Sequence, residues 1–201
     1  MLIVFPVYFA TQSQNSIVIS VAQGSSNKEV VVIQLYEQID SGSASMISRG
    51  ISRAEADQAS AVIVDMNTPG GLLSDMVTMI GAINSTTIPV YTFVGNDSSA
   101  ASAGSYVAMA TDKIYMAPGS QIGPSTPFII GGTALEQQHV QNYAQSLMET
   151  LAAAHGRNVT AAGIMVSNNT AYTYSQAIGL HVVDGLSTSL PKLISSLNLS
   201  D

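Results

Sequence analysis

Short runs of β-branched residues alternate along this chain with segments whose apolar residues recur at helical spacing. The runs at residues 30–35 and 61–66 are bounded by charged or turn residues, which is typical of strands. Between them, apolar positions in residues 43–59 recur every few residues and predict a helix. Strands that alternate with helices pair in parallel through right-handed crossovers. The pattern therefore predicts an α/β fold with flanking helices on a parallel sheet.

The same alternation continues along the rest of the chain. Gly156 follows a long helical segment at the position where glycine commonly ends a helix. Residues 174–185 predict a helix, a turn and a closing strand. The remaining predicted segments are strands at residues 88–94 and 113–117 and helices at residues 72–83, 99–111, 134–154 and 160–166.

The length of the chain, 201 residues, suits one well-buried domain and is too short for two. We expect this domain at residues 29–201, after an N-terminal segment at residues 1–28. Residues 1–10 are apolar and are either the remainder of a signal sequence or a first strand. The sequence has no run of about 18 to 20 apolar residues, so it predicts no ordinary membrane-spanning helix.

The composition excludes several functions. Charged residues make up 9% of the chain, six basic and thirteen acidic, so no basic surface is expected to hold nucleic acid. The chain has no cysteine, and its histidines and carboxylates lack metal-ligand spacing, so we expect no metal and no cofactor. Five Asn-x-Ser/Thr triplets fit an exported protein that can be glycosylated.

Two motifs follow predicted strands, where α/β folds place their functional sites. Pro69-Gly70-Gly71 follows the strand at residues 61–66, and glycines there let the backbone turn sharply and expose N–H groups to a ligand. The segment 99–104 places the hydroxyl of Ser102 among alanine and glycine at the start of a predicted helix. Backbone N–H groups at such a position can stabilise a developing oxyanion. Together the motifs supply a nucleophile and an anion site.

The order of the motifs carries a family resemblance. Asp65-Met66-Asn67-Thr68-Pro69-Gly70-Gly71 is followed by Ala100-Ala101-Ser102-Ala103-Gly104 and then by Met116-Ala117-Pro118-Gly119-Ser120-Gln121-Ile122-Gly123. The set resembles the Clp and signal-peptide-peptidase superfamily, and within it the NfeD group encoded beside stomatins. Gly156-Arg157-Asn158 and the segment 177–184 extend the agreement, which spans roughly residues 30 to 188. The resemblance implies a ClpP/crotonase-like fold and serine protease activity.

The resemblance also assigns residues to roles. Ser102 matches the family nucleophile, and the N–H groups of Gly70 and Ala103 match its oxyanion hole. A serine nucleophile needs a neighbouring base. The histidine that Clp proteases use as that base aligns with Ser125, and their aspartate falls near Asn169, so the Clp relay is absent.

The NfeD group resembles serine proteases that use a lysine as base instead. The family lysine lies near the start of the long helix, and the corresponding residue here is His139. Imidazole, whose ordinary pKa is about 6.5, can act as a base without the burial that a lysine requires. Two interpretations stay open: His139 is the base, or the base has been lost and the domain is a pseudoprotease that binds or scaffolds membrane proteins.

Other residues and reactions are weaker candidates. Lys113 is an alternative base that would have to reach the site from a neighbouring strand, whereas His155 and His181 are expected to be structural. A crotonase acting on a coenzyme A thioester would share the anion site, but the few basic residues argue against binding of that nucleotide.

The resemblance implies an extended apolar substrate, such as a segment of a stomatin-like membrane protein. In this superfamily the peptide lies as an added strand beside the glycine turn, so Gly71, Leu72 and Ser125 are the expected substrate contacts. We further expect a homo-oligomer, with a dimer as the first expectation, at a membrane-associated or exported location on the extracytoplasmic side.

Overall fold

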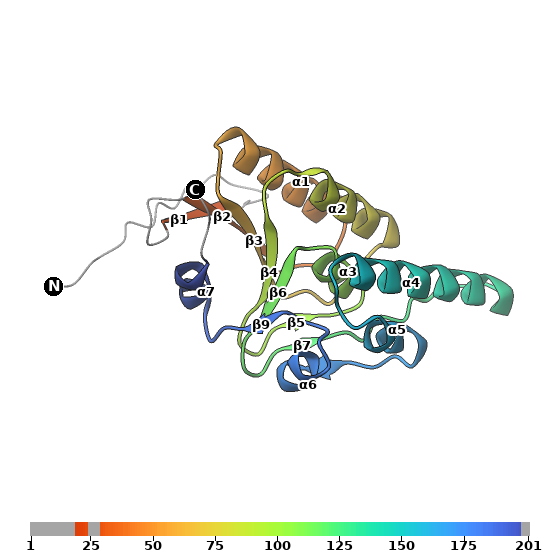
Figure 1. The fold of residues 1–201 in the computed structure, drawn as a ribbon. Helices are drawn as coiled ribbons and strands as arrows, with labels where there is room; N and C mark the ends of the chain where they lie inside the picture. The colour runs from red at the N-terminus through yellow and green to blue at the C-terminus, as the bar shows by residue number, and fades with distance from the viewer. Residues whose placement is uncertain (1–18, 24–28, 198–201) are drawn as a thin grey trace.

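A six-stranded sheet forms the centre of the computed structural model, which describes residues 19–23 and 29–197 (Figure 1). In spatial order its strands are β1 (Ile19–Gln23), β2 (Glu29–Leu35), β3 (Ala61–Met66), β4 (Val90–Val94), β6 (Lys113–Met116) and β9 (Gly185–Leu186). Every pair from β2 to β9 is parallel, which confirms the predicted α/β class. Only β1 runs antiparallel, beside β2 at the edge.

The first two helices and the long helix lie close to their predicted positions. α1 (Ser41–Ala56) begins with a capping box in which Asp40 and Ser43 satisfy each other's backbone N–H groups. α4 (Ala134–Ala154) begins with the same arrangement between Thr133 and Glu136. The other helices are α2 (Leu73–Ser85), α3 (Ala103–Met109), α5 (Val159–Ser167), α6 (Tyr174–Gly179) and α7 (Leu190–Ser196).

The central sheet is covered on both faces. Alternate residues of β3, such as Val62 and Val64, lie in the larger apolar core with residues of α1, α2 and α3. Ile63 points the other way, into a smaller cluster that includes Leu193 of α7. All residues of β3 are buried, which explains why five of its six residues are apolar and do not alternate with polar ones.

A small second sheet lies beside the first and was not predicted. It consists of β5 (Ser99–Ala100), β7 (Gln121–Ile122) and β8 (Tyr172–Thr173), in that order. The predicted helix at residues 99–111 was therefore wrong in its first part, because only Ala103–Met109 is helical. Ser99–Ala100 pairs with β7 instead, and this tertiary pairing overrides the helical preference of alanine.

Two further expectations concern the ends of the domain. His181 was placed in a closing strand, but it lies in a turn at φ +58°, and the last strand is β9. The possible first strand at residues 1–10 lies outside the described residues. None of the described helices combines the length and apolar character needed to cross a membrane.

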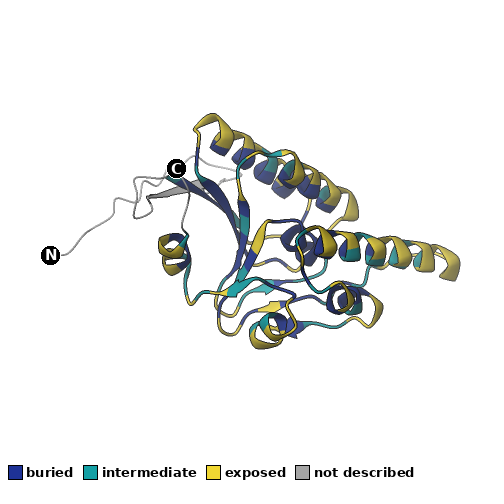
Figure 2. Cartoon of the chain, viewed as in Figure 1, coloured by how far each residue is buried: buried dark blue, intermediate teal, exposed yellow. Residues whose placement is uncertain are grey.

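The amino-terminal half of α4 extends away from the body of the domain (Figure 1). The buried residues of this helix all lie in its second half: Ala144, Met148, Leu151 and Ala152. Its outer surface is exposed (Figure 2). The half that carries His139 contributes no buried residue, and Gln137 joins it to the preceding loop, accepting from Ile129 N–H at 2.8 Å and donating to Pro127 O at 2.7 Å.

Candidate active site

The glycine turn after β3 is held in place by backbone pairing with the segment after β2. Ile39 N–H donates to Gly70 O at 2.8 Å, and Leu72 N–H donates to Ile39 O at 2.8 Å. A Cβ on Gly71 would lie 2.0 Å from Ile39 O, so no larger residue fits at this position. Gly70 adopts φ +96°, a conformation that glycine reaches at no steric cost.

The same turn contacts the segment that carries Ser102. Thr68 N–H donates to Ser99 O at 2.8 Å, and Ala101 N–H donates to Thr68 O at 3.1 Å. A Cβ on Gly70 would lie only 2.5 Å from the Cβ of Ser102. The structure therefore brings together the two motifs that the sequence places in separate βα units.

Ser102 occupies a strained backbone conformation at the start of α3. Its φ of +50° and ψ of −124° fall outside the regions that residues with a side chain normally adopt. Such a conformation costs about 1–3 kcal/mol and persists at functional sites where the surroundings hold it. Ser102 N–H donates to Pro124 O at 2.8 Å, and Ser102 O accepts from Ser105 N–H at 3.0 Å. The result is a sharp strand-to-helix turn that presents a partly exposed hydroxyl.

The two predicted oxyanion donors lie next to each other. Ala103 is the first residue of α3, so its N–H has no acceptor within the helix. The Cβ position of Gly70 is 3.0 Å from Ala103 N. Gly70 N–H donates to Thr68 Oγ1 at 3.1 Å, and this hydroxyl in turn donates to Glu37 O at 2.6 Å. Of the two donors, Gly70 N–H therefore already has an acceptor, whereas Ala103 N–H has none within α3.

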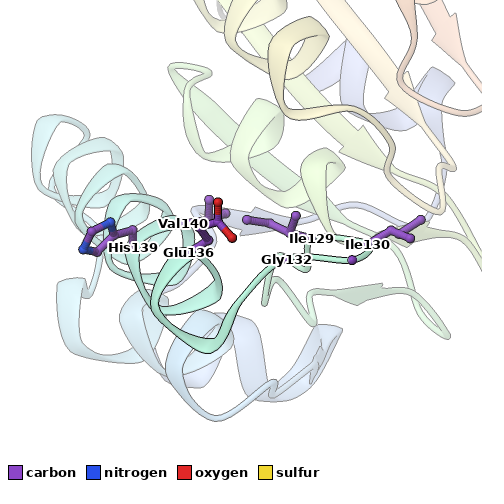
Figure 3. A pocket seen from close by; sticks show the side chains of 7 residues that line it. Ile129, Ile130, Gly132, Glu136, His139 and Val140 are labelled. Carbon is purple, nitrogen blue, oxygen red and sulfur yellow. The ribbon is translucent and has the colours of Figure 1, made fainter.

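His139 lies on the protruding half of α4 and is exposed. It lines a shallow hollow of about 390 Å³, whose other lining residues are Ile129, Ile130, Gly131, Gly132, Glu136 and Val140. Its imidazole points away from Ile129 and Ile130 (Figure 3). Within the described residues, no hydrogen bond joins His139 to Ser102. The structure brings Ser102, Gly70 and Ala103 together but leaves His139 apart from them.

The three expected substrate contacts differ in exposure. Leu72 is 60% exposed at the end of the glycine turn, directly after Gly71. Ser125 is buried, and its Oγ lies 2.6 Å from Ser105 Oγ. Tyr106 O–H donates to Ser125 O at 2.9 Å. Leu72 can meet a peptide directly, whereas the Ser125 hydroxyl is bonded beneath the nucleophile.

The other candidate bases have structural partners. Lys113 begins β6, and its Nζ lies 3.2 Å from Asp184 Oδ1. His155 caps the end of α4, where burial and the neighbouring Arg157 lower the pKa of its imidazole. Lys113 and His155 thus both have structural roles, at the edge of the sheet where β6 begins. Ser102 follows β4 and β5, beyond their carboxyl ends.

A buried ion pair that the sequence did not predict lies at the far end of α3. The Arg157 side chain is fully buried, and its guanidinium donates to Asp184 Oδ2 at 3.0 Å, to Met109 O at 2.7 Å and to Thr111 O at 2.8 Å. Asp184 also accepts from Ile114 N–H. The sequence places Arg157 only in a family motif after α4, and no local pattern relates it to the end of α3 or to Asp184, which are distant in sequence.

A buried carboxyl group near the glycine turn was missed as well. Asp65 is 5% exposed in β3, and its carboxylate accepts a hydrogen bond from the Tyr36 hydroxyl. Burial raises the pKa of Asp65 above the ordinary carboxyl value, and burial together with Asp65 raises the pKa of Tyr36. The sequence signal for this buried carboxyl group is an aspartate inside a run of β-branched residues. Within the described residues, no cluster of three or more histidines and carboxylates could hold a metal ion.

The parallel sheet, the glycine turn and the serine at the start of a buried helix define a ClpP-like α/β domain. The chain belongs to the NfeD family, because the sequence model described as "NfeD1b, N-terminal domain" matches residues 29–199. This match confirms the resemblance inferred from the order of the motifs.

Two curated relatives are similar to this chain over part of their length. The membrane-bound protease PH1510 of Pyrococcus horikoshii is 33% identical over 175 residues, which is 84% of this chain and 40% of the relative. Membrane protein NfeD1b of Bacillus subtilis is 37% identical over 133 residues, which is 64% of this chain and 29% of the relative. The chain therefore spans less than half the length of either protein.

Solved structures of the 1510-N membrane-bound stomatin-specific protease have the same fold. A lysine-to-alanine mutant in complex with a substrate peptide superposes with a TM-score of 0.74 at 32% identity, covering 82% of this chain and 76% of that chain. A serine-to-alanine mutant gives a TM-score of 0.75 at 31% identity, covering 82% and 81%.

Proposed function

We propose that this chain is a serine endopeptidase domain in which Ser102 is the nucleophile. The observation that carries the proposal is the strained backbone of Ser102, held directly against Gly70 of the glycine turn. The similarity to proteases whose structures include a serine mutant and a peptide complex supports it. In the reaction, Ser102 Oγ attacks the peptide carbonyl carbon, and a base takes the hydroxyl proton and returns it to the leaving amine.

The oxyanion would be held by the backbone amides of Ala103 and Gly70. The Ala103 N–H has no acceptor inside α3, so it can serve the oxyanion without breaking a bond. The Gly70 N–H would exchange its bond to Thr68 Oγ1, which is 3.1 Å long, for a bond to the charged oxygen. A hydrogen bond to an ionised acceptor is stronger than one to a neutral hydroxyl, so this exchange favours the transition state.

The substrate would be an extended apolar segment of a membrane-associated protein. Leu72, Leu73 and Val77 are exposed apolar residues just after the glycine turn. Phe128 and Ile130 are exposed on the loop that leaves the site after Pro124. Apolar side chains of a peptide paired near Gly71 would find partners on both segments. A stomatin-like protein is the proposed partner, by analogy with the stomatin-specific relative, and the extracytoplasmic membrane surface is the proposed location.

His139 is proposed as the base that replaces the family lysine. Its side chain is exposed on a helix half that lacks buried residues, so an approach to Ser102 requires movement of this half or of the loop before it. Substrate or a second copy of the chain could supply the packing that the protruding half lacks. We therefore propose a homo-oligomer, a dimer in the first instance. A molar mass equal to one chain in light scattering would contradict this part of the proposal.

A pseudoprotease is the alternative function, and the position of His139 favours it. In that case the surface beside the glycine turn binds apolar segments without cleaving them. A fluorophosphonate probe that reacts with activated serines separates the two functions when it is applied from about pH 5 to about pH 9. Labelling that is lost in Ser102→Ala supports the peptidase. No labelling at any pH, together with binding of an apolar peptide, would establish the alternative.

A further inference from the structure

The loop that follows β7 contacts the Ser102 turn and the start of α3 at three points. Pro124 O accepts from Ser102 N–H at 2.8 Å. Ser125 Oγ lies 2.6 Å from Ser105 Oγ, and Ser125 O accepts from the Tyr106 hydroxyl at 2.9 Å. Burial raises the pKa of Tyr106, so its hydroxyl remains a donor. Two adjacent residues of the loop thus hold both the nucleophile turn and the first turn of α3.

The direction of the hydrogen bonds in this cluster follows from the number of available protons. Ser105 Oγ also lies 2.6 Å from Ser102 O, and a carbonyl oxygen can only accept. Ser105 has one hydroxyl proton, which therefore goes to Ser102 O. The contact between the two serine hydroxyls must then use the proton of Ser125. The chain of donation runs from Ser125 to Ser105 and ends at the backbone carbonyl of the nucleophile.

We propose that Ser105 and Ser125 are positioning residues that hold Ser102 in its strained conformation. This proposal rests on the proposed function of Ser102 as nucleophile and assigns Ser125 a role other than direct substrate contact. The Ser102 carbonyl accepts both the amide and the hydroxyl of Ser105, which fixes ψ of Ser102. Ser125 prevents the Ser105 hydroxyl from turning toward another acceptor. The buried pair thereby acts on the orientation of the Ser102 hydroxyl through the backbone.

A third buried serine provides a matched control. Ser120 is 1% exposed, and its hydroxyl donates to the carbonyl of Ala117, three residues earlier, at 2.6 Å. The Ser105 bond to Ser102 O has the same sequence separation and length. Ser120→Ala therefore removes an equivalent bond that does not involve the nucleophile. A general loss of stability would affect all three alanine variants alike.

Hydrogen exchange of the Ser102 amide tests the positioning directly and does not depend on catalysis. This amide is bonded to Pro124 O, so its protection reports whether the turn stays closed. We expect exchange measured by NMR to be about tenfold faster in Ser105→Ala and in Ser125→Ala, the effect of losing roughly one buried hydrogen bond. We expect the wild-type rate in Ser120→Ala. Ser125→Thr, which keeps the hydroxyl, should restore protection.

Reaction with the fluorophosphonate probe gives the second measurement. The Ser102 labelling rate should fall about tenfold in either variant, and peptide cleavage should lose kcat with little change in KM. Because the two serines act in series, the double variant should be no slower than Ser105→Ala. If the wild type is not labelled, the proposed function fails, and the exchange rates still decide the positioning role. Wild-type exchange of the Ser102 amide in Ser125→Ala would overturn the inference, as would equal loss in Ser120→Ala.

Discussion

Replacement of Gly70 by alanine tests the contact between the two motifs most directly. The new Cβ would lie 2.5 Å from Ser102 Cβ and 3.0 Å from both Ala101 O and Ala103 N. Carbon atoms normally remain about 3.5–4.0 Å apart, so the turn or the Ser102 segment must move. Movement of either segment would misplace the oxyanion donors relative to the nucleophile.

Two effects of this substitution lower the free energy of unfolding, and their magnitudes add. Alanine at φ +96° is strained by about 1–3 kcal/mol. Overpacking against Ser102 costs about 1–3 kcal/mol more, because the opposing atoms belong to backbone or to a short side chain. The expected loss is therefore about 2–6 kcal/mol. For a domain of this size it corresponds to a Tm lower by roughly 5–20 °C.

Thermal unfolding and fluorophosphonate labelling should be measured together on Gly70→Ala and on a control. Gly81 is exposed in α2 and has nothing within 4 Å of its Cβ position. Gly81→Ala should therefore raise the free energy of unfolding by about 0.5–1 kcal/mol and leave labelling unchanged. If Gly70→Ala unfolds within about 2 °C of the wild type and labels at the wild-type rate, the proposed arrangement of the site is wrong.

Three other substitutions test separate parts of the structure. An imidazole accepts a proton only when neutral, so with His139 as base cleavage should increase from acidic to neutral pH; His139→Ala should abolish this rise, and an unchanged profile would refute the dyad. Arg157→Met should lower the free energy of unfolding by about 3–5 kcal/mol, because Asp184 is left buried without its main partner. Lys113→Ala, which removes the exposed partner of Asp184, should lower it by less than about 1 kcal/mol. Equal losses for the two variants in denaturant unfolding would contradict this prediction. Burial raises the pKa of Asp65 in the folded protein. The protonated carboxyl group therefore favours the folded state below the ordinary carboxyl pKa, and this stabilisation is lost as the pH rises through the raised pKa of the folded protein. Asp65→Asn should therefore be more stable than the wild type at neutral pH by about 1 kcal/mol, with the difference shrinking as the pH falls through the raised pKa of Asp65 and gone below the ordinary carboxyl pKa of about 4; a constant difference would exclude the carboxyl group as its cause.

The long elements of the fold could be predicted because their sequence patterns are local. The β-branched run at Ala61–Met66 and the helix at Ala134–Ala154 appear in the structure at the predicted residues. Two-residue strands such as Ser99–Ala100 could not be predicted in this way. Their pairing depends on β7, which is distant in sequence, and their composition of small residues also suits a helix.

The residues of the candidate site also differ in how far they could be predicted from the sequence. Gly70 and Ser102 could be identified because motif order relates them, and the structure places them in contact. The position of His139 along α4 could be counted, but counting gives neither the face of the helix nor its packing. Ser125 illustrates the same limit, since alignment with a catalytic histidine does not reveal a hydroxyl bonded to Ser105.

The complete burial of α3 has a consequence for how such domains can diverge. All seven of its residues are buried, with Ser102 at one end and the Arg157 guanidinium on the Met109 carbonyl at the other. A helix fixed at both ends accepts few substitutions, because any larger side chain would displace the nucleophile. New substrate preferences must therefore arise in the exposed segments that border it, the start of α2 and the loop before α4. Substitutions in those exposed segments should disturb the Ser102 turn less than substitutions within α3.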